Sequence, residues 1–313
     1  MLVLGLETSC DDTSVALVRD GREILANLVS SQIEAHAVYG GVVPELASRA
    51  HTELLTPLID AALAEAKVGF AAIDAVAVTQ GPGLLGALLV GVTAAQALGW
   101  ALDVPVVGVN HLEAHLFANF LVDPDLKPPV LALLVSGGHT ALVIMEDFGH
   151  YRLVGQTVDD AAGEAFDKVA RMIGLPYPGG PPIDNLAPSG NARAFDFPQA
   201  RLTNPYDFSF SGLKTAVLYT VQKLPQPLPV ADLAASFQRA AVGALVKKTA
   251  RAAADLGMET VILAGGVASN RELRARLAET LAKQGARLVV PPPGLCSDNA
   301  AMIAARGYHQ LLG

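Results

Sequence analysis

His111 and His115 lie four residues apart in the segment VPVVGVNHLEAH, residues 104–115, which has the pattern of a short buried strand followed directly by a helix. Asn110 occupies the position of a helix N-cap, and Glu113 follows it at capping-box spacing, which predicts that the helix begins at His111. Both imidazoles would then lie on one helical face, close enough to bind a single metal ion. The spacing is not that of the protease motif HExxH, and an ordinary polar helix face would also explain it.

A carboxylate near the C-terminus completes a possible ligand set. Ser297 is expected to cap the last helix as Asn110 caps its counterpart, which places Asp298 at the position equivalent to His111. Two histidines and one carboxylate leave coordination positions open for substrate, as in catalytic iron or zinc sites. The alternative is that Asp298 simply lies in the first turn of a helix, where acidic residues are favoured.

The elements that would position these residues occur twice along the chain. Strand, strand, strand, helix, strand, helix, strand and helix are expected in that order before residue 128, and again from residue 129. Alternating strands and helices indicate an α/β layered fold built from a duplicated unit. We therefore expect an N-terminal lobe at 1–128 and a C-terminal lobe at 129–296, with the helix at 297–313 packing back on the first lobe. If the lobes face each other across a cleft, His111, His115 and Asp298 would converge there.

Composition narrows the possible partners and compartment. The net charge of −8 over 313 residues argues against broad nucleic-acid binding without a local basic patch or a partner. The best basic clusters are Lys247-Lys248-Arg251 and Arg271/Arg274/Arg276. Two cysteines and no leader-like N-terminus favour the cytoplasm. Residues 75–102 carry no formal charge, but Gly81-Pro82-Gly83 interrupts them, so a buried helix is expected in preference to a membrane span.

Three glycine-rich or small-residue turns are candidates for binding a nucleotide. The turns at 7–13 and 136–140 end equivalent hairpins, and Gly265-Gly266 follows a strand. Free backbone N–H groups in such turns can bind phosphate oxygens, and glycine allows close approach of a base or ribose. Each is most often an ordinary tight turn. Their matching positions in a duplicated unit suggest a nucleotide between two lobes.

Several long motifs resemble one known family. They include GLETSCDDTSVAL, QGPGLLGALLVG, GVNHLEAH, LLVSGGHTALV, GEAFDKVARMIGLPYPGGPPID, FSFSGLKTAV and LAGGVASNRELR. Together they are similar, in order and over essentially the whole chain, to the bacterial tRNA adenosine threonylcarbamoyltransferase (TsaD) family. The resemblance implies a duplicated actin/Hsp70/sugar-kinase-like (ASKHA) two-lobe fold. It also implies an acyltransferase that moves the threonylcarbamoyl group from threonylcarbamoyl-AMP to N6 of tRNA adenosine 37, 3′ of the anticodon, in tRNAs that read codons beginning with A.

The resemblance also implies roles for individual residues and partners. His111, His115 and Asp298 match the metal ligands of the family, for which Fe²⁺ is the usual metal and zinc an alternative. The expected substrate-binding residues are Leu134, Val135, Ser136, Gly137, Gly138, Asp167, Gly180, Asp184 and Asn270. The implied partners are a paralogous subunit of the same fold and a small ATPase. No residue is nominated as general base.

Other classes of protein fit part of the sequence. A small-molecule kinase or ATPase of the same fold would use the phosphate-binding turns, but it has no need for two histidines opposite Asp298. A metalloprotease predicts HExxH, which is absent. A non-catalytic paralogue would lack the histidine pair.

Overall fold

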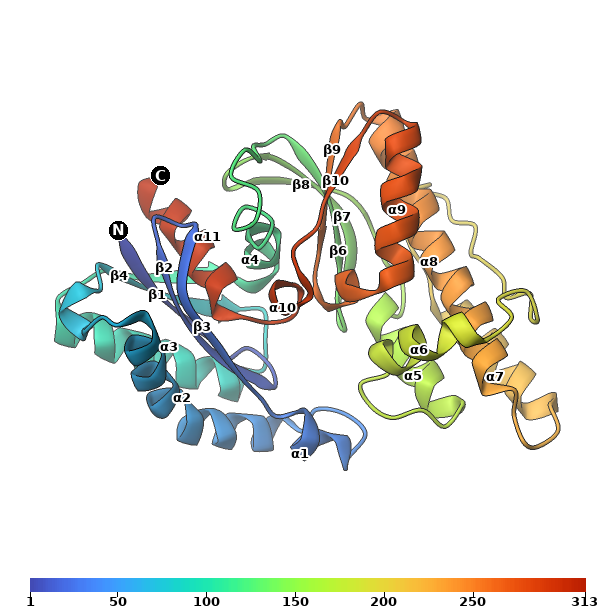
Figure 1. Cartoon of the computed structure of the whole chain (residues 1–313), viewed down its shortest axis with the longest axis horizontal. Helices are drawn as coiled ribbons and strands as arrows, with labels where there is room; N and C mark the ends of the chain where they lie inside the picture. Colours follow the sequence, from blue (N-terminus) through green and yellow to red (C-terminus); the bar gives the residue numbers. More distant parts are fainter. The chain divides into compact units, whose positions relative to one another are not determined.

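The computed structural model describes residues 1–313 and divides into two compact units. Unit 1 contains Met1–Leu126 together with Gly294–Gly313, and unit 2 contains Lys127–Pro293. The chain therefore leaves unit 1 once and returns to it for its last twenty residues. Each unit has its own sheet and its own helices (Figure 1).

Unit 1 is built on a five-stranded sheet in the order β3-β2-β1-β4-β5. The first three strands are antiparallel, and β4 and β5 continue the sheet in parallel with β1. The strands are β1 (Leu2–Glu7), β2 (Asp12–Arg19), β3 (Glu23–Ser31), β4 (Ala75–Gly81) and β5 (Val106–Asn110). The helices are α1 (Ile33–Ala37), α2 (Pro44–Ala66), η1 (Phe70–Ala72), α3 (Leu85–Leu102), α4 (His111–Phe117), α10 (Pro293–Cys296) and α11 (Ala300–Leu312).

Both faces of this sheet are covered, which explains why β1 is apolar at every position before Glu7. Leu4 and Leu6 pack in one core cluster with residues of α2 and α3. Val3, which precedes Leu4 and points to the opposite face, packs in a second cluster with residues of α4 and α11. Successive side chains of a strand point to opposite faces, so a strand covered on both sides reads as a continuous hydrophobic run.

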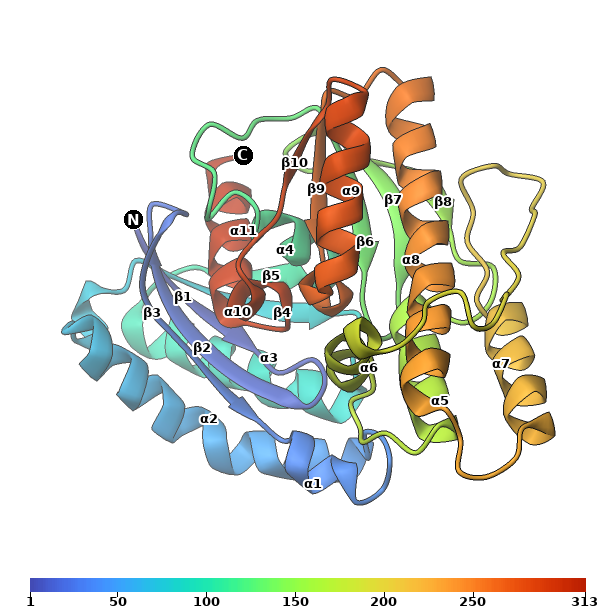
Figure 2. The same cartoon turned by 45° about the vertical axis from the view of Figure 1, so that its right-hand side comes forward.

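Unit 2 repeats this plan, with its sheet in the order β10-β9-β6-β7-β8. Figure 2 shows α8 and α9 next to each other beside these strands. The strands are β6 (Val130–Val135), β7 (Thr140–Asp147), β8 (His150–Gln156), β9 (Thr260–Ala264) and β10 (Arg287–Val289). The helices are α5 (Ala162–Met172), α6 (Gly180–Leu186), η2 (Ala187–Ser189), α7 (Ser211–Lys223), α8 (Val230–Asp255), η3 (Gly266–Ser269) and α9 (Arg271–Lys283).

The two sheets have the same topology, strand for strand. β6 pairs antiparallel with β7 and parallel with β9, as β1 pairs with β2 and β4. The predicted duplicated α/β fold is therefore confirmed. The short helix α1 was not expected from the sequence.

The prediction that residues 84–102 form a buried helix is wrong. In α3 only Ala87, Gly91, Ala95 and Gly99 are buried, while Trp100 is 89% exposed. A Cβ at Gly91 would lie 2.4 Å from Thr8 Oγ1, so these small residues let the helix approach the sheet closely. Val90, Val92, Leu98 and Leu102 are partly buried against the core, but Leu85, Leu89 and Trp100 are exposed, and a hydropathy average over the helix does not reveal this. By length and composition α3 is also the one helix that could cross a membrane.

Candidate functional site

The histidine pair is positioned by the start of α4. Asn110, the last residue of β5, accepts hydrogen bonds through Oδ1 from the backbone N–H groups of Leu112 (2.9 Å) and Glu113 (3.2 Å). The helix begins at His111, as predicted. His111 and His115 consequently share one face, with ring centroids 4.7 Å apart.

Asp298 reaches the same place from a different local structure than expected. The helix α11 begins at Ala300, and its cap is Asn299, whose Oδ1 accepts from Met302 N at 3.2 Å. Ser297 is not the cap; its carbonyl accepts from Asn299 Nδ2 at 2.8 Å. Asn299 outcompetes Ser297 because its amide binds both the helix start and the preceding turn. Asp298 therefore lies one residue before the cap of α11, whereas His111 is the first residue after the cap of α4, so the two positions are not equivalent as predicted.

The structure nevertheless brings the three predicted ligands together within unit 1. Asp298 Oδ1 lies 3.2 Å from His115 Nε2 and 3.5 Å from His111 Nε2. One ligand atom from each of the three side chains lies within 4.8 Å of the others. Ligand atoms about 2.1 Å from a tetrahedral metal would be about 3.4 Å apart. The two distances from Asp298 match this spacing, so the cluster has room for a metal between side chains from two separate segments of unit 1.

A buried carboxylate that the sequence reasoning missed orients His111. Glu7, at the end of β1, accepts a hydrogen bond from His111 Nδ1 through Oε2 at 2.9 Å. Oε2 also accepts from Thr79 Oγ1 at 2.6 Å, and Oε1 accepts from Ser9 N at 2.5 Å. A carboxylate on Nδ1 makes Nε2, which faces Asp298, the nitrogen that can bind a metal once it has lost its proton, and this is the arrangement found behind metal-bound histidines. The sequence did contain a signal for this role: Glu7 ends an otherwise apolar strand, and a buried carboxylate needs a hydrogen-bond or charge partner.

The charges of this cluster support one another. Burial would lower the pKa of His111, but Glu7 and Asp298 outweigh it and raise that pKa to about 9. Burial would raise the pKa of Asp298, but His111 and His115 lower it to about 2. Burial likewise opposes the charge on Glu7, and His111 holds the pKa of Glu7 below its ordinary value. Both carboxylates are therefore ionised at neutral pH, as metal ligands and their supports must be.

His115 provides the sharpest indication that a ligand belongs here. Its side chain is 1% exposed, and neither ring nitrogen makes a well-aligned hydrogen bond, although Nε2 lies 3.2 Å from Asp298 Oδ1. Unsatisfied buried polar atoms are costly, so most are paired in folded proteins. A cation bound by His115 Nε2 and Asp298 would satisfy that nitrogen. The residues present fit a divalent metal.

An ion pair holds the two helices of the site together. Arg306 of α11 donates to Glu113 Oε2 of α4 at 2.9 Å, and its guanidinium carbon lies 5.2 Å from the centre of the Phe117 ring. Glu113 thus contacts Arg306 through its side chain, besides donating its N–H to the cap. The histidine helix is fastened in this way to the segment that carries Asp298.

A histidine network fixes the β1–β2 turn beside the site. His51 accepts from Thr13 Oγ1 through Nδ1 at 2.7 Å and donates through Nε2 to the carbonyl of Cys10 at 2.9 Å. Burial lowers the pKa of His51, which keeps the ring neutral. Burial also raises the pKa of the Cys10 thiol, so this cysteine stays protonated. The His51 side of the turn is thus held by neutral hydrogen bonds, whereas Ser9 is held by the Glu7 carboxylate.

The nucleotide-binding residues expected from the resemblance lie in unit 2. Asp184 Oδ2 accepts from Arg271 Nε at 2.7 Å, and both line a cavity of about 360 Å³ that also contains Gln238. Asn270 caps α9 through Oδ1 and donates Nδ2 to Gln238 Oε1 at 2.8 Å. The amide of Asn270 therefore already has protein partners at both ends. Gln238 and Arg271 were not singled out by the sequence as nucleotide contacts.

The remaining expected residues surround the β6–β7 turn and the start of α6. Leu134 and Val135 end β6 and are buried, whereas Gly137 and Gly138 are exposed in the turn. Ser136 closes the turn by donating its N–H to the carbonyl of His139 at 2.8 Å. Gly180 is the first residue of α6, and a Cβ there would meet nothing within 4 Å. Asp167 of α5 accepts from the N–H of Gly179 at 2.7 Å.

Comparison with known proteins identifies the family of this chain. The family model described as tRNA N6-adenosine threonylcarbamoyltransferase (TsaD) matches residues 23–305. The protein of that name from Symbiobacterium thermophilum is 57% identical, with 98% of this chain and 91% of that one covered. The Bacillus subtilis protein is 54% identical, with 98% and 90% covered. The chain belongs to this family.

Solved structures agree on the fold. The ROK hexokinase from Thermus thermophilus has a TM-score of 0.55 at 16% identity, with 100% of this chain and 98% of that one covered. Component A of the (R)-2-hydroxyglutaryl-CoA dehydratase from Acidaminococcus fermentans has a TM-score of 0.58 at 14% identity, with 100% of both chains covered. At these identities the likeness establishes an ASKHA-type fold. The function follows from the family: the chain is an acyltransferase of tRNA threonylcarbamoyladenosine modification.

Proposed function

We propose that the donor for this transferase is threonylcarbamoyl-AMP, and that the acceptor is the adenosine directly 3′ of the tRNA anticodon. We assign one divalent metal, Fe²⁺ in preference to zinc, to His111, His115 and Asp298. We assign the adenylate to unit 2. The observation that carries the metal assignment is the convergence of three ligand atoms around the buried His115 Nε2, which lies 3.2 Å from Asp298 Oδ1 without a well-aligned hydrogen bond.

The transfer reaction requires correct positioning of the two substrates more than it requires a strong base. The donor is a mixed anhydride with AMP as its leaving group, so it is already activated. The N6 amine is a weak nucleophile because its lone pair is delocalised into the ring. In the transfer the N6–carbonyl bond forms, the carbonyl–phosphate bond breaks, and the amine loses a proton. Binding and charge stabilisation are what the protein must add.

The residues of each unit have separate tasks in this proposal. When bound, the metal supplies a Lewis acid and a template for substrate oxygens. Glu7 keeps the proton of His111 on Nδ1, which leaves Nε2 available as a ligand. In unit 2, Asp184 holds the Arg271 guanidinium at the wall of the cavity, where a nucleoside and its phosphate could bind.

The activity assay uses purified chain, threonylcarbamoyl-AMP, unmodified tRNA and the partner proteins. Mass spectrometry of the digested tRNA should show threonylcarbamoyladenosine, dependent on the chain and on metal. Brisk turnover of ATP by the chain alone, with no modified nucleoside, would contradict the proposal. We expect the protein in the cytoplasm, where its tRNA substrate is found.

A paralogous subunit of the same fold is the partner that we assign to α3. Leu85, Leu89 and Trp100 lie on one side of this helix and are exposed, and the helix carries no charge. Exposed apolar side chains that gather on one face of a helix commonly mark protein interfaces. We propose that the small ATPase binds the complex that this chain forms with the paralogous subunit.

The partner assignment is tested with Trp100→Ala. Loss of an aromatic anchor typically costs about 2 kcal/mol or more, roughly 30-fold in affinity. Size-exclusion chromatography and calorimetry with the paralogue should show this loss, while metal content stays unchanged. Tyr219→Ala, at an exposed aromatic residue of unit 2, is the control. Equal partner affinity for Trp100→Ala and wild type would remove α3 from the interface.

A further inference from the structure

The charge of the chain is distributed very unequally between the two units. Unit 1 contains 5 Lys and Arg against 16 Asp and Glu, whereas unit 2 contains 17 against 14. The net charge of −8 is therefore the sum of −11 and +3. A polyanion is repelled by unit 1 and attracted only to unit 2, so any surface that binds one should lie there.

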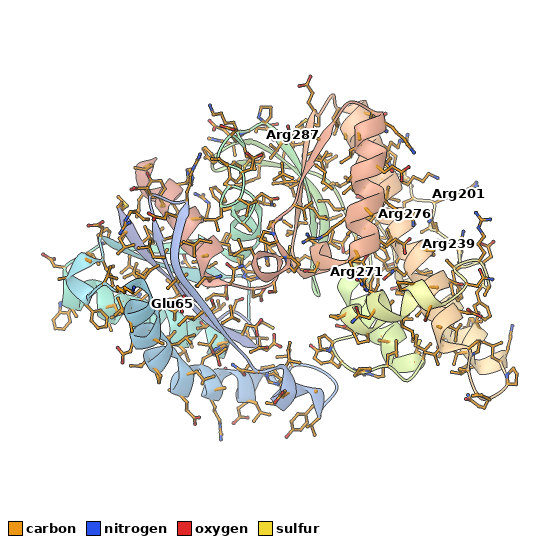
Figure 3. All side chains as sticks on the ribbon, in the orientation of Figure 1. Glu65, Arg201, Arg239, Arg271, Arg276 and Arg287 are labelled. Carbon is orange, nitrogen blue, oxygen red and sulfur yellow. The ribbon has the colours of Figure 1, made fainter.

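Four arginines of unit 2 gather around α8 and α9 (Figure 3). Arg239 of α8 and Arg276 of α9 are in contact, because Arg276 Nη1 donates to the carbonyl of Arg239 at 3.3 Å. The preceding loop is tied to the same turn of α8, since Gln199 Nε2 donates to the carbonyl of Ala240 at 3.0 Å. Arg201 follows two residues later. Arg271 begins α9.

These four residues, called here the arginine surface, remain accessible. The side chains of Arg239, Arg271 and Arg276 are 38%, 61% and 37% exposed, and Arg201 is exposed as well. Two other basic residues suggested by the sequence, Arg274 and Lys248, are used internally, whereas Lys247 and Arg251 are exposed on the far part of α8. Arg274 donates to the carbonyls of Ala268 and Pro291, and Lys248 donates to that of Asp207.

The acids near the arginine surface hold Arg271 and Arg276 in place but leave Arg239 free to exchange partners, since Asp184 lies 2.7 Å from Arg271. Asp196 lies 3.5 Å from Arg239 and is itself fully exposed, and such pairs contribute little in water. Glu272 lies 2.6 Å from Arg276 but also accepts from Gln238, so it supports the wall of the cavity. A phosphate could replace Asp196 without leaving a buried charge.

We propose that the arginine surface binds the phosphate backbone of the tRNA substrate. The planar guanidinium of arginine forms paired hydrogen bonds to phosphate oxygens, which the ammonium group of lysine cannot do. The surface also adjoins the candidate nucleotide cavity, because Arg271 contacts Asp184 there. This inference rests on the proposed function, since it assigns a place to the RNA that the transferase modifies.

The test removes two positive charges from the arginine surface and compares the effect with the removal of two positive charges from unit 1. Arg201→Gln/Arg239→Gln is the test variant, and Arg19→Gln/Arg49→Gln is the matched control, because Arg19 and Arg49 are exposed and ion-paired in unit 1. Binding of tRNA is measured against salt concentration, with the chain alone and in the complete modification complex. Threonylcarbamoyl-AMP affinity and thermal unfolding are measured on the same proteins.

The test variant should bind tRNA about tenfold more weakly, with KM for tRNA raised and kcat kept. The slope of log affinity against log salt should become shallower by about 0.7–0.9 for each phosphate that the variant no longer neutralises. Arg201→Lys/Arg239→Lys should recover part of the affinity, and adenylate binding and unfolding should not change.

Three outcomes would overturn the assignment. The test variant could bind tRNA as the wild type does, or the unit 1 control could weaken binding equally, which would make the effect one of net charge. The test variant could instead weaken association with a partner protein while tRNA binding is kept, which would make the arginine surface an acidic-protein site. If the wild type itself forms no threonylcarbamoyladenosine, the proposed function fails, whatever these variants do.

Discussion

The ends of equivalent strands in the two sheets carry opposite kinds of residue. By the pairing registers, Glu7 and Thr79 of unit 1 correspond to Val135 and Gly265 of unit 2. In unit 1 a carboxylate and a hydroxyl meet there and orient His111. In unit 2 the same place has an apolar side chain and a glycine, so this strand end presents backbone rather than a charged side chain.

This difference shows how one topology can support two kinds of binding. The carboxyl ends of adjacent parallel strands converge in both sheets, which makes each a natural binding edge. Polar side chains at that edge create a small, charged site suited to a cation. Glycine and exposed N–H groups create an open one suited to a nucleotide. Substitutions at each edge should therefore affect metal binding and nucleotide binding separately. They are described below in order of decreasing expected effect.

His115→Ala should abolish the unit 1 site while leaving unit 2 intact. Loss of a direct ligand should cost more than the 10–100-fold typical of residues that only support ligands, so metal and transfer should fall by more than about 100-fold together. Metal content by mass spectrometry and modified nucleoside by digestion measure this. His150→Ala, at the exposed first residue of β8, is the control. Full transfer by metal-free His115→Ala protein would refute the catalytic metal.

Asp184→Ala should weaken adenylate binding by unit 2 and leave metal binding by unit 1 unchanged. Loss of a charge-assisted hydrogen bond costs roughly 1.5–3 kcal/mol, about 10–150-fold in affinity for a non-hydrolysable adenylate. Asp298→Ala should do the reverse, releasing metal but keeping much of the affinity for AMP. Both quantities are measured on each variant. If either change removes metal and nucleotide together, the two sites are not independent.

The sequence predicted some of these features because their signals are local. Asn110 before a periodic apolar run fixes the start of α4, and therefore the shared face of the two histidines. The cap of α11 was misplaced because Ser297 and Asn299 are both good caps, and only the turn that precedes the helix decides between them. Glu7 was missed because its partners, Thr79 and His111, are distant in sequence. The exposure of α3 depends on which residues meet the sheet, which composition does not encode.

Glu7→Gln should weaken the metal site without dismantling it, and should change its pH dependence. In the metal-free site the pKa of His111 is raised to about 9, so below that pH a metal must displace a proton. Apparent metal affinity should therefore rise with pH and level off near pH 9. Glutamine cannot stabilise the imidazolium, so the pKa of His111 should fall and the plateau should begin at lower pH.

The height of that plateau is a separate measurement. It should be about 10–100-fold lower in Glu7→Gln, because His111 loses the carboxylate that orients it. Metal titrations between about pH 6 and 10 on both proteins give the two quantities. Unchanged affinity and unchanged midpoint would mean that Glu7 only fills space beneath the histidine.

Gly265→Ala tests whether unit 2 depends on bare backbone at the position where unit 1 has Thr79. Gly265 has φ +90°, and a Cβ there would lie 2.4 Å from the carbonyl oxygen of Val135. Strain of this kind costs about 1–3 kcal/mol, so the free energy of unfolding and the adenylate affinity should both fall, with metal retained. Gly266→Ala is the matched control, because a Cβ there meets nothing within 4 Å. If urea unfolding and adenylate titration cannot distinguish the two variants, close approach of the backbone is not what the glycine provides, and the contrast between the two strand ends loses its physical basis.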